Sequence, residues 1–397
     1  MKIAYISFEY PPDTAIGGIA TYTEHAARLM AARGHQVEVF TSRPSRESLN
    51  EKQRHENLFV HRIHVADRGL FPQRVLPVFE KRHEQVQFDI VESPEYSYEG
   101  LEIKKAFPQL PLVVRFHTPS FWVKHLNKKY LADSIKEKLK KALGIKQYKK
   151  ENDKEYRFSL LADGWLVPCQ PMKDMLIEYW GLEADKISII PNPFQPPEPL
   201  LQIDPYTHTN TVSFIGRLEV RKGVTQFAAA IPMVLKERPG TFFRFIGKPN
   251  HAPDKTMMMD DFLKRELVAY SQQVRFIPHV PKEQIPELLS QTDVCVFPSY
   301  WELFGYVCTE AMAAARGIVA SKTGGMNDML EDIRGGILID PSSASDIASG
   351  ILYLLNNPAE RKAMAQRSRA KTLGYYANDV PARMEQYYAG IIKKARK

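Results

Sequence analysis

Short apolar runs alternate with segments of helical period along most of the chain. The apolar runs of the first half are KIAYISF, QVEVFTS, FDIVES, LPLVVRFHT and GWLVPC, and those of the second half are VSFIGRL, FFRFIG, VRFIPHV, VCVFPS and IVAS. Strands that alternate with helices along a chain are typical of parallel sheets. The pattern therefore predicts an α/β protein with two doubly wound parallel sheets, one in each half.

A proline-rich stretch separates the two sets of predicted strands. Residues 190 to 210 contain six prolines and no apolar period, which suits an interdomain linker better than a packed element. We expect a first domain over 1–195 and a second over 205–375. In residues 376–397, apolar or aromatic side chains recur at helical spacing, among them Met384, Tyr388 and Ile391, and predict a final helix.

Length and composition agree with two folded domains. A chain of 397 residues with 44% hydrophobic residues is long and apolar enough for two cores. The opening MKIAYISF is typical of a first strand, and no apolar run reaches the roughly 18 residues that a membrane-spanning helix needs. The three cysteines have no metal-ligand spacing and are expected to be reduced thiols. These features predict a cytoplasmic protein, with the inner face of a membrane as an alternative location.

The segment WELFGYVCTEAMAAARG, Trp301 to Gly317, contains two carboxylates around a Phe-Gly pair where a predicted strand gives way to a helix. The helix is expected over residues 309–316. Backbone N–H groups from Gly305 onward can bind phosphate at its start. Glu310, expected in the first helical turn, can accept a pair of hydroxyl groups, and Glu302 in the preceding loop can reach a third polar group. A nucleotide sugar offers that mixture of groups.

A second candidate site lies in FIGRLEVRKG, which places Arg217 and Lys222 in the loop after an apolar strand. Two basic residues in a loop are usually solvated surface charges. Here they could hold a diphosphate, because breaking a bond from a sugar to phosphate builds up negative charge that fixed cations stabilise. A site of this kind needs no metal ion.

The order P-S-x-x-E-x-F-G-x-x-x-x-E-A-M-A-x-x-x-G in this chain resembles the donor-site signature of retaining glycosyltransferases of family four, which have the GT-B fold. G-R-L-x-x-x-K-G resembles the phosphate-binding pattern of the same family. The resemblance implies two Rossmann-like domains that face a cleft. The domain 1–195 would bind the acceptor, the domain 205–375 would bind the nucleotide-sugar donor, and the helix in 376–397 would cross back to the first domain.

The resemblance also implies roles for individual residues. His117, Arg217, Lys222 and Glu302 would be catalytic, with Glu302 contacting the transferred sugar and Glu310 holding the ribose. Donor-binding roles fall on Gly17, Gly18, Gly216, Phe304, Gly305, Tyr306, Val307 and Glu310. On their own, the glycine pair at 17–18 indicates a tight turn, and a histidine after a strand is more often structural.

Departures from the family pattern affect the expected base pocket. Lys248 and Pro249 follow Gly247 where a second glycine is often found, and Pro278 replaces another glycine. The donor is therefore a UDP-, GDP- or ADP-linked sugar, with the base undecided. We expect no cofactor and no metal.

The net charge of +8 is concentrated in residues 121–157, which contain twelve Lys or Arg and five Asp or Glu. Leu131, Ile135, Leu139 and Leu143 recur every four residues and predict a helix with a basic face. Such a helix either packs on the core with a solvated face or meets an anionic acceptor, such as a phosphate-bearing glycan or lipid, or an acidic membrane surface.

The leading interpretation is a retaining glycosyltransferase that moves a sugar from a nucleoside diphosphate to a hydroxyl of a glycan, a glycolipid or a small molecule. A nucleotide-sugar epimerase or a phosphorylase would share the fold. Nucleic-acid binding is suggested by the pI of about 9.1, but no recognised motif supports it. An NAD-dependent dehydrogenase would need G-x-G-x-x-G after a strand, and neither candidate loop supplies it.

Overall fold

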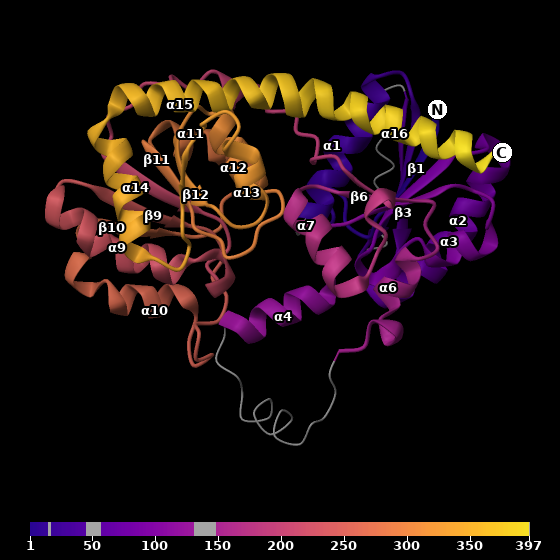
Figure 1. The fold of residues 1–397 in the computed structure, drawn as a ribbon, viewed down its shortest axis with the longest axis horizontal. Helices are drawn as coiled ribbons and strands as arrows, with labels where there is room; N and C mark the ends of the chain where they lie inside the picture. Colours follow the sequence, from indigo (N-terminus) through magenta and orange to yellow (C-terminus); the bar gives the residue numbers. More distant parts are fainter. Residues whose placement is uncertain (15–16, 45–56, 131–147, 397) are drawn as a thin grey trace. The chain divides into compact units, whose positions relative to one another are not determined.

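The protein is described by a computed structural model that covers residues 1–14, 17–44, 57–130 and 148–396 (Figure 1). The described residues form two compact units. The first contains residues 1–122, 148–195 and 375–396, and the second contains residues 123–130 and 196–374. Each unit has its own parallel sheet.

The sheet of the first unit has the strand order β3-β2-β1-β4-β5-β6-β7, and every neighbouring pair is parallel. Its strands are β1 (Lys2–Ile6), β2 (Gln36–Arg43), β3 (Leu58–His64), β4 (Ile90–Pro94), β5 (Leu112–Arg115), β6 (Gly164–Val167) and β7 (Ile187–Ile189). The main helices between them are α1 (Gly18–Ala32), α2 (Phe71–Val86), α3 (Leu101–Ala106), α6 (Lys154–Ser159) and α7 (Gln170–Met175). Helix α4 (Ser120–Tyr130) follows β5, and its residues from Val123 onward belong to the second unit. Chain order reverses between β1 and β4.

The sheet of the second unit has the order β10-β9-β8-β11-β12-β13, again with parallel pairs throughout. Its strands are β8 (Thr211–Ile215), β9 (Phe242–Ile246), β10 (Val274–Ile277), β11 (Val294–Phe297), β12 (Gly317–Ser321) and β13 (Ile337–Ile339). Its helices include α8 (Glu198–Leu201), α9 (Val224–Glu237), α10 (Met259–Glu266), α11 (Ile285–Ser290), α12 (Tyr306–Ala313), α13 (Gly325–Leu330), α14 (Ala344–Asn356) and α15 (Pro358–Lys371). The two sheets confirm the predicted α/β class.

The central strands of the second unit are buried along their whole length. All four residues of β11 are buried, and so are the residues of β8 and β12. A strand covered by helices on both faces has no solvent-facing side, so the period of two that marks a half-exposed strand is absent. Chain order reverses between β8 and β11, and in open parallel sheets ligands bind at the carboxyl ends of the strands beside such a reversal.

The last helix, α16 (Val380–Ala395), packs in the first unit although it follows the second in sequence (yellow in Figure 1). It contacts α1, and its apolar stripe buries Met384, Tyr388, Ile391 and Ile392. On its outer side, the Glu385 carboxylate accepts a hydrogen bond from Arg33 of the loop after α1, at 2.5 Å. The first unit is therefore built from both ends of the chain.

The proline-rich stretch 190–210 is more structured than we expected. Ile190, Asn192, Phe194 and Leu200 are buried, and residues 198–201 form α8. The prolines fix the backbone angle φ but do not prevent packing of the apolar side chains between them. The expectation of an unpacked linker is therefore wrong for this part of the chain.

Candidate active site

The loop after β8 is held against the loop after β11 by a glycine. Gly223 ends the short helix Val220–Lys222 with φ of 72°, in the left-handed region. A Cβ atom at this position would collide with the carbonyl oxygen of Pro298. Only glycine allows this close approach, which brings Lys222 beside the segment that follows β11.

Main-chain hydrogen bonds join the same two loops. The Tyr300 N–H donates to the Arg221 carbonyl at 2.9 Å, and the Arg221 guanidinium donates to the Trp301 carbonyl at 3.0 Å. On the other side, the Gly325 N–H at the start of α13 donates to the Glu302 carbonyl at 2.7 Å. Glu302 is therefore held in place through its own backbone and that of its neighbours.

Lys222 and Glu302 form a direct, hydrogen-bonded ion pair. Burial lowers the pKa of the Lys222 ammonium, while the Glu302 charge opposes that shift. Burial alone would raise the pKa of Glu302, but the charges of Lys222 and Arg221 reverse the effect and hold it below its usual value. The site thus keeps an ionised carboxylate and an ammonium group in contact at the carboxyl edge of the sheet.

Arg217 differs from Lys222 in its exposure. Its side chain is 61% exposed and lies 3.9 Å from a carboxylate oxygen of Glu219, which pairs more closely with Arg221 at 2.7 Å. Sequence reasoning did not select Glu219 or Arg221, which brace this loop. The charged residues of L-E-V-R-K are visible in the sequence. The sequence does not show, however, which of them stabilise the loop and which could bind a ligand.

Helix α12 begins at Tyr306, three residues before the expected start at Thr309. Tyr306, Val307 and Cys308 have modest helix propensity, but burial of Tyr306 and Cys308 compensates for it. Gly305 is the N-cap residue, and since it has no side chain it provides no side-chain cap to the helix. The backbone N–H groups of the first helical turn point back toward Phe304 and Gly305, the last two residues of the preceding loop.

The earlier start corrects the predicted place of Glu310, which lies beyond the first turn of α12 rather than within it. Its side chain is partly buried. Burial raises the pKa of the Glu310 carboxyl to about 7, with Lys282 opposing the shift. A carboxyl poised near neutrality can accept hydrogen bonds from a pair of hydroxyl groups once it is ionised.

The first unit contains the remaining predicted residues. Gly17 is the N-cap of α1, and a Cβ atom there would lie 3.7 Å from a carboxylate oxygen of Glu9, which is an ordinary contact. A Cβ atom on Gly18 would meet no atom of the described residues within 4 Å. Packing within the first unit therefore requires neither glycine.

His117 follows β5 and is fixed through its backbone. Its N–H donates to both carboxylate oxygens of Glu95, at 3.0 and 2.9 Å. The imidazole Nδ1 lies 3.1 Å from the Arg115 carbonyl, which can only accept, so Nδ1 carries the proton. Nε2 has no hydrogen-bond partner among the described residues. In the neutral ring this Nε2 atom is an acceptor.

A buried polar network in the first unit was missed by sequence reasoning. Glu92 in the middle of β4 accepts hydrogen bonds from the Tyr22 hydroxyl at 2.6 Å and the Tyr388 hydroxyl at 2.5 Å. Burial raises the pKa of Glu92, and the charge of Arg115 opposes that shift. The Arg115 guanidinium lies over the Tyr22 ring and donates to Asn192 at 2.5 Å. These side chains come from five separate segments, so no local pattern predicts the network.

The predicted residues thus fall into two groups. Gly216, Arg217, Lys222, Glu302, Phe304, Gly305, Tyr306, Val307 and Glu310 lie at or just beyond the carboxyl ends of neighbouring strands of the second sheet. Gly17, Gly18 and His117 lie in the first unit.

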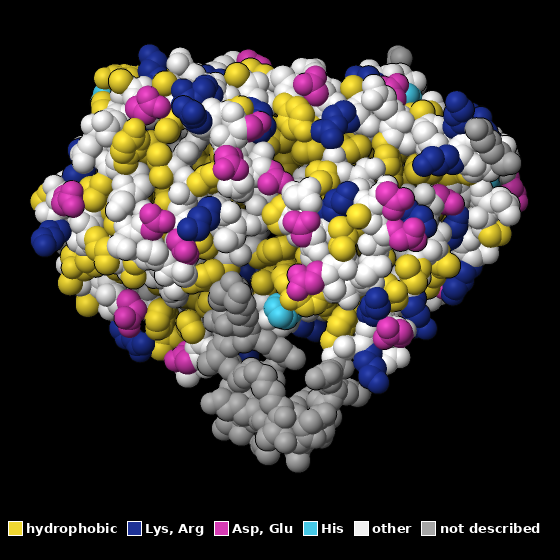
Figure 2. Space-filling view, in the orientation of Figure 1, with side chains coloured by type: hydrophobic (Ala, Val, Ile, Leu, Met, Phe, Trp, Pro, Cys, Tyr) yellow, Lys and Arg dark blue, Asp and Glu magenta, His cyan; other side chains and the backbone are white. Residues whose placement is uncertain are grey.

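The basic stretch 121–157 is described only in part, because residues 131–147 lie outside the described residues. The predicted basic helix and its contact with an anionic surface therefore remain predictions. On the face drawn in Figure 2, basic and acidic side chains of the described residues are interspersed. Each helix in the described ranges is too short or too polar to span a lipid bilayer.

Two family models match the chain, and both describe glycosyltransferases. Residues 16–196 match Glycosyltransferase Family 4, and residues 202–371 match Glycosyl transferases group 1. The two matches lie one after the other and follow the two sheets. The chain is a glycosyltransferase of the GT-B type.

Individual proteins agree with this class. A glycogen synthase of Mycobacterium tuberculosis is 25% identical, with 93% of this chain and 90% of the relative covered. A sucrose-phosphate synthase of Thermosynechococcus elongatus has a similar structure, with a TM-score of 0.73, 20% identity and 99% of each chain covered. The catalytic domain of starch synthase IV of Arabidopsis thaliana, solved with ADP and acarbose, has a TM-score of 0.70 and 15% identity, again with 99% of each chain covered.

Proposed function

We propose that the protein is a retaining glycosyltransferase that transfers a hexosyl group from a nucleoside diphosphate sugar to a hydroxyl of a carbohydrate acceptor without a metal ion. The observation that carries the proposal is the Lys222 and Glu302 ion pair beside the start of α12. A cation, a helix N-terminus and two carboxyl groups at one sheet edge match the charges and hydroxyls of such a donor.

In the proposed complex, the diphosphate lies between Arg217, Lys222 and the first N–H groups of α12. The exposed Arg217 side chain has room to swing onto the phosphates. Glu310 accepts the ribose hydroxyls, and Glu302 accepts a hydroxyl of the transferred sugar. Lys222 already contacts Glu302, so it can bridge from that carboxylate to the phosphate beside the sugar.

The reaction then depends on charge that develops on the leaving group. As the bond from the anomeric carbon to the phosphate oxygen breaks, Lys222, Arg217 and the helix N-terminus stabilise the departing diphosphate. The acceptor oxygen attacks from the same face, and its proton passes to the leaving phosphate oxygen. The new glycosidic bond keeps the configuration of the donor. Detection by mass spectrometry of a glycosyl adduct on a side chain would contradict this path.

His117 suits a sugar hydroxyl better than the diphosphate in this scheme. With the proton on Nδ1, its Nε2 accepts a hydrogen bond and would repel a phosphate oxygen. We therefore assign His117 to a hydroxyl group of the transferred sugar. His117→Ala should reduce turnover while leaving the affinity for the free nucleoside diphosphate unchanged.

A thermal-shift screen against UDP, GDP, ADP and their glucose conjugates, with and without EDTA, tests the donor site. A ligand that binds the folded state raises the melting temperature. We expect one base to stabilise the protein in a way that EDTA does not change and that Glu310→Ala abolishes. The ADP in the starch synthase IV structure and the UDP-glucose in a similar structure, that of HepE from Anabaena, make ADP-glucose and UDP-glucose the first candidates. If none of these ligands shifts the melting temperature, the proposed donor site is wrong.

A further inference from the structure

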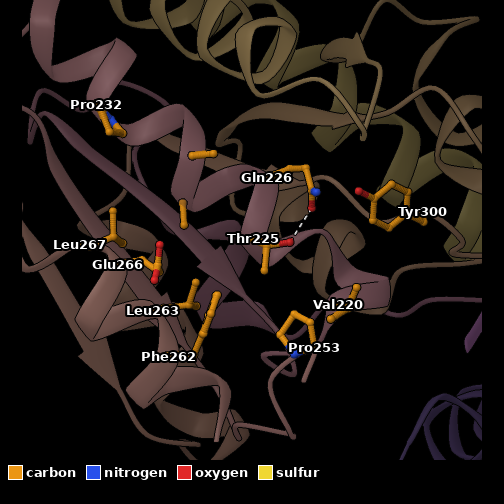
Figure 3. Close-up of a pocket in the computed structure, with 12 residues that line it drawn as sticks. Val220, Thr225, Gln226, Pro232, Pro253, Phe262, Leu263, Glu266, Leu267 and Tyr300 are labelled. Atoms are coloured by element: carbon orange, nitrogen blue, oxygen red, sulfur yellow. Dashed lines mark hydrogen bonds between the residues drawn. The ribbon is translucent and has the colours of Figure 1, made fainter. Parts of the chain in front are cut away.

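The second unit contains a pocket of about 450 Å³ that the proposed donor site does not use (Figure 3). It lies between α9 and α10 and extends to the loops that contain Val220, Pro253 and Tyr300. Pockets of this volume are typical of small-molecule sites.

The lining of the pocket is apolar in the middle. Ala228 and Ala229 of α9 face Phe262 and Leu263 of α10, and Pro232 extends the apolar surface along α9. The side chains of Ala228 and Ala229 are small, which leaves room for a ligand between α9 and α10. Proline and phenylalanine rings offer flat C–H and π surfaces to a ligand.

Hydrogen-bonding groups lie toward both ends of the pocket. At one end the Thr225 hydroxyl donates to the Gln226 side-chain oxygen at 2.7 Å, which leaves the Gln226 amide nitrogen as a donor. Figure 3 shows the Tyr300 hydroxyl directed toward Gln226 from the facing loop. At the other end lies the carboxylate of Glu266. The polar groups of the lining are therefore an amide, hydroxyls and a carboxylate.

The charge of the lining selects against anions. None of the described residues that line the pocket is Lys or Arg, and Glu266 would repel a phosphate or a second carboxylate. An unbranched lipid chain would satisfy the apolar middle but would leave the polar ends facing methylene groups. A carbohydrate has flat C–H faces for the middle and hydroxyls for both ends, and it carries no charge.

Resting on the proposed function, which makes a carbohydrate the acceptor, we propose that this pocket binds a short, uncharged segment of the acceptor or product glycan. The site is separate from the one that holds the donor, but two of its lining residues belong to the donor loops. Val220 lies two residues before Lys222, and Tyr300 lies two residues before Glu302. The hydrogen bond from the Tyr300 N–H to Arg221 joins these loops directly.

Occupation of the pocket should therefore change donor affinity. A glycan that presses on Val220 and Tyr300 favours one arrangement of the two loops, and the Lys222 and Glu302 pair depends on that arrangement. Such coupling is reciprocal, so nucleotide binding must change glycan affinity by the same factor.

Saturation-transfer NMR with maltotriose as the probe tests the site. Wild-type protein should bind maltotriose in the absence of nucleotide. Any binding of glucose 1-phosphate, which the proposed donor site can accept, should be the same in wild type and in Ala229→Trp. Ala229→Trp places an indole ring in the pocket from an exposed helix position, and it should weaken maltotriose binding at least tenfold, about 1.4 kcal/mol. Glu237→Trp, two turns further along α9 and exposed, is the matched control and should bind as wild type does.

The outcomes separate this inference from the proposed function. Nucleotide shifts without maltotriose binding would overturn the pocket assignment and leave the donor site intact. Equal weakening in the two tryptophan variants, or binding of glucose 1-phosphate at this site, would also overturn it. An unchanged nucleotide Kd at saturating maltotriose would remove the proposed coupling. Absence of any nucleotide shift would contradict the proposed function itself, whatever maltotriose does.

Discussion

The carboxyl edges of the two sheets are stabilised in different ways. In the second unit, glycines and main-chain hydrogen bonds bring two loops together, and the ion pair of Lys222 and Glu302 lies partly open to solvent. In the first unit, side chains close the sheet just before the corresponding edge, where Glu92, two residues before the end of β4, is enclosed by Tyr22 and Tyr388. One edge thus leaves a pair of charges within reach of solvent, whereas the other uses a buried carboxylate to hold distant segments together.

If this comparison is right, removing a charge at the open edge should mainly affect catalysis. Lys222→Ala should reduce turnover at least about 100-fold, because it removes a preorganised cation from the leaving group. The same loss is expected for Arg217→Ala and Glu310→Ala. Steady-state kinetics with the donor found in the thermal-shift screen provides the measurement.

Lys264→Ala is the control for that experiment, because Lys264 is an exposed cation of α10 that pairs with Asp260 and Asp261. Its turnover should equal that of wild type. Equal losses in Lys222→Ala and Lys264→Ala would mean that general surface charge, and not the site, is responsible.

Removing a polar group at the closed edge should mainly affect stability. Tyr388→Phe removes a hydroxyl from the buried Glu92 carboxylate and should lower the free energy of unfolding by about 1–3 kcal/mol. Urea unfolding gives the value. Tyr387→Phe, which removes a longer hydrogen bond of 3.3 Å to the Trp165 carbonyl, should cost less. A larger loss of stability for Tyr387→Phe than for Tyr388→Phe would contradict the proposed contribution of the Glu92 network to stability.

Both edges contain a carboxyl group with a raised pKa, and this predicts a pH dependence. Burial raises the pKa of Glu310 to about 7 and that of Glu99, which accepts from the Phe8 N–H, to about 8. The ordinary value is 4.5, so the folded state binds more protons than the unfolded state between these values. The free energy of unfolding should therefore fall as pH rises, by at most about 1.4 kcal/mol per pH unit for each group.

Amide variants distinguish the two carboxyls. Glu310→Gln should flatten the pH dependence of stability between about 4.5 and 7, and Glu99→Gln should flatten it up to about 8. Urea unfolding at several pH values checks this. A profile that both substitutions leave unchanged would show that neither carboxyl titrates as described.

The smallest effect is expected on the outer side of α16. Arg33→Ala removes an exposed ion pair with Glu385 and should change the free energy of unfolding by at most about 1 kcal/mol. A loss as large as that of Tyr388→Phe would mean that the surface contact, and not the buried network, fixes the helix.

The open edge could be predicted from the sequence and the closed edge could not. Lys222, Glu302, Gly305 and Glu310 lie within two short segments with recognisable spacing, and these segments follow neighbouring strands, which places them at the same edge of the sheet. Even there, the start of α12 was placed three residues too late, since burial outweighs helix propensity.

The network around Glu92 shows why the rest was missed. Its partners Tyr22 and Tyr388 are separated from it by 70 and 296 positions. Each alone looks like an ordinary apolar-face tyrosine, and only the fold brings their hydroxyls together. The carboxylate was equally hidden, because a glutamate inside FDIVES gives no sign that its neighbours will enclose it.

The return of the last helix to the first unit has a consequence for synthesis. A ribosome that has made residues 1–195 has completed the first sheet but not the helix that buries Met384 and Tyr388 against it. Until the end of the chain emerges, Glu92 lacks one of its two hydroxyl partners. The nascent first unit must therefore wait, incompletely folded, while the whole second unit is translated, and this interval is when it is most exposed to proteases and chaperones.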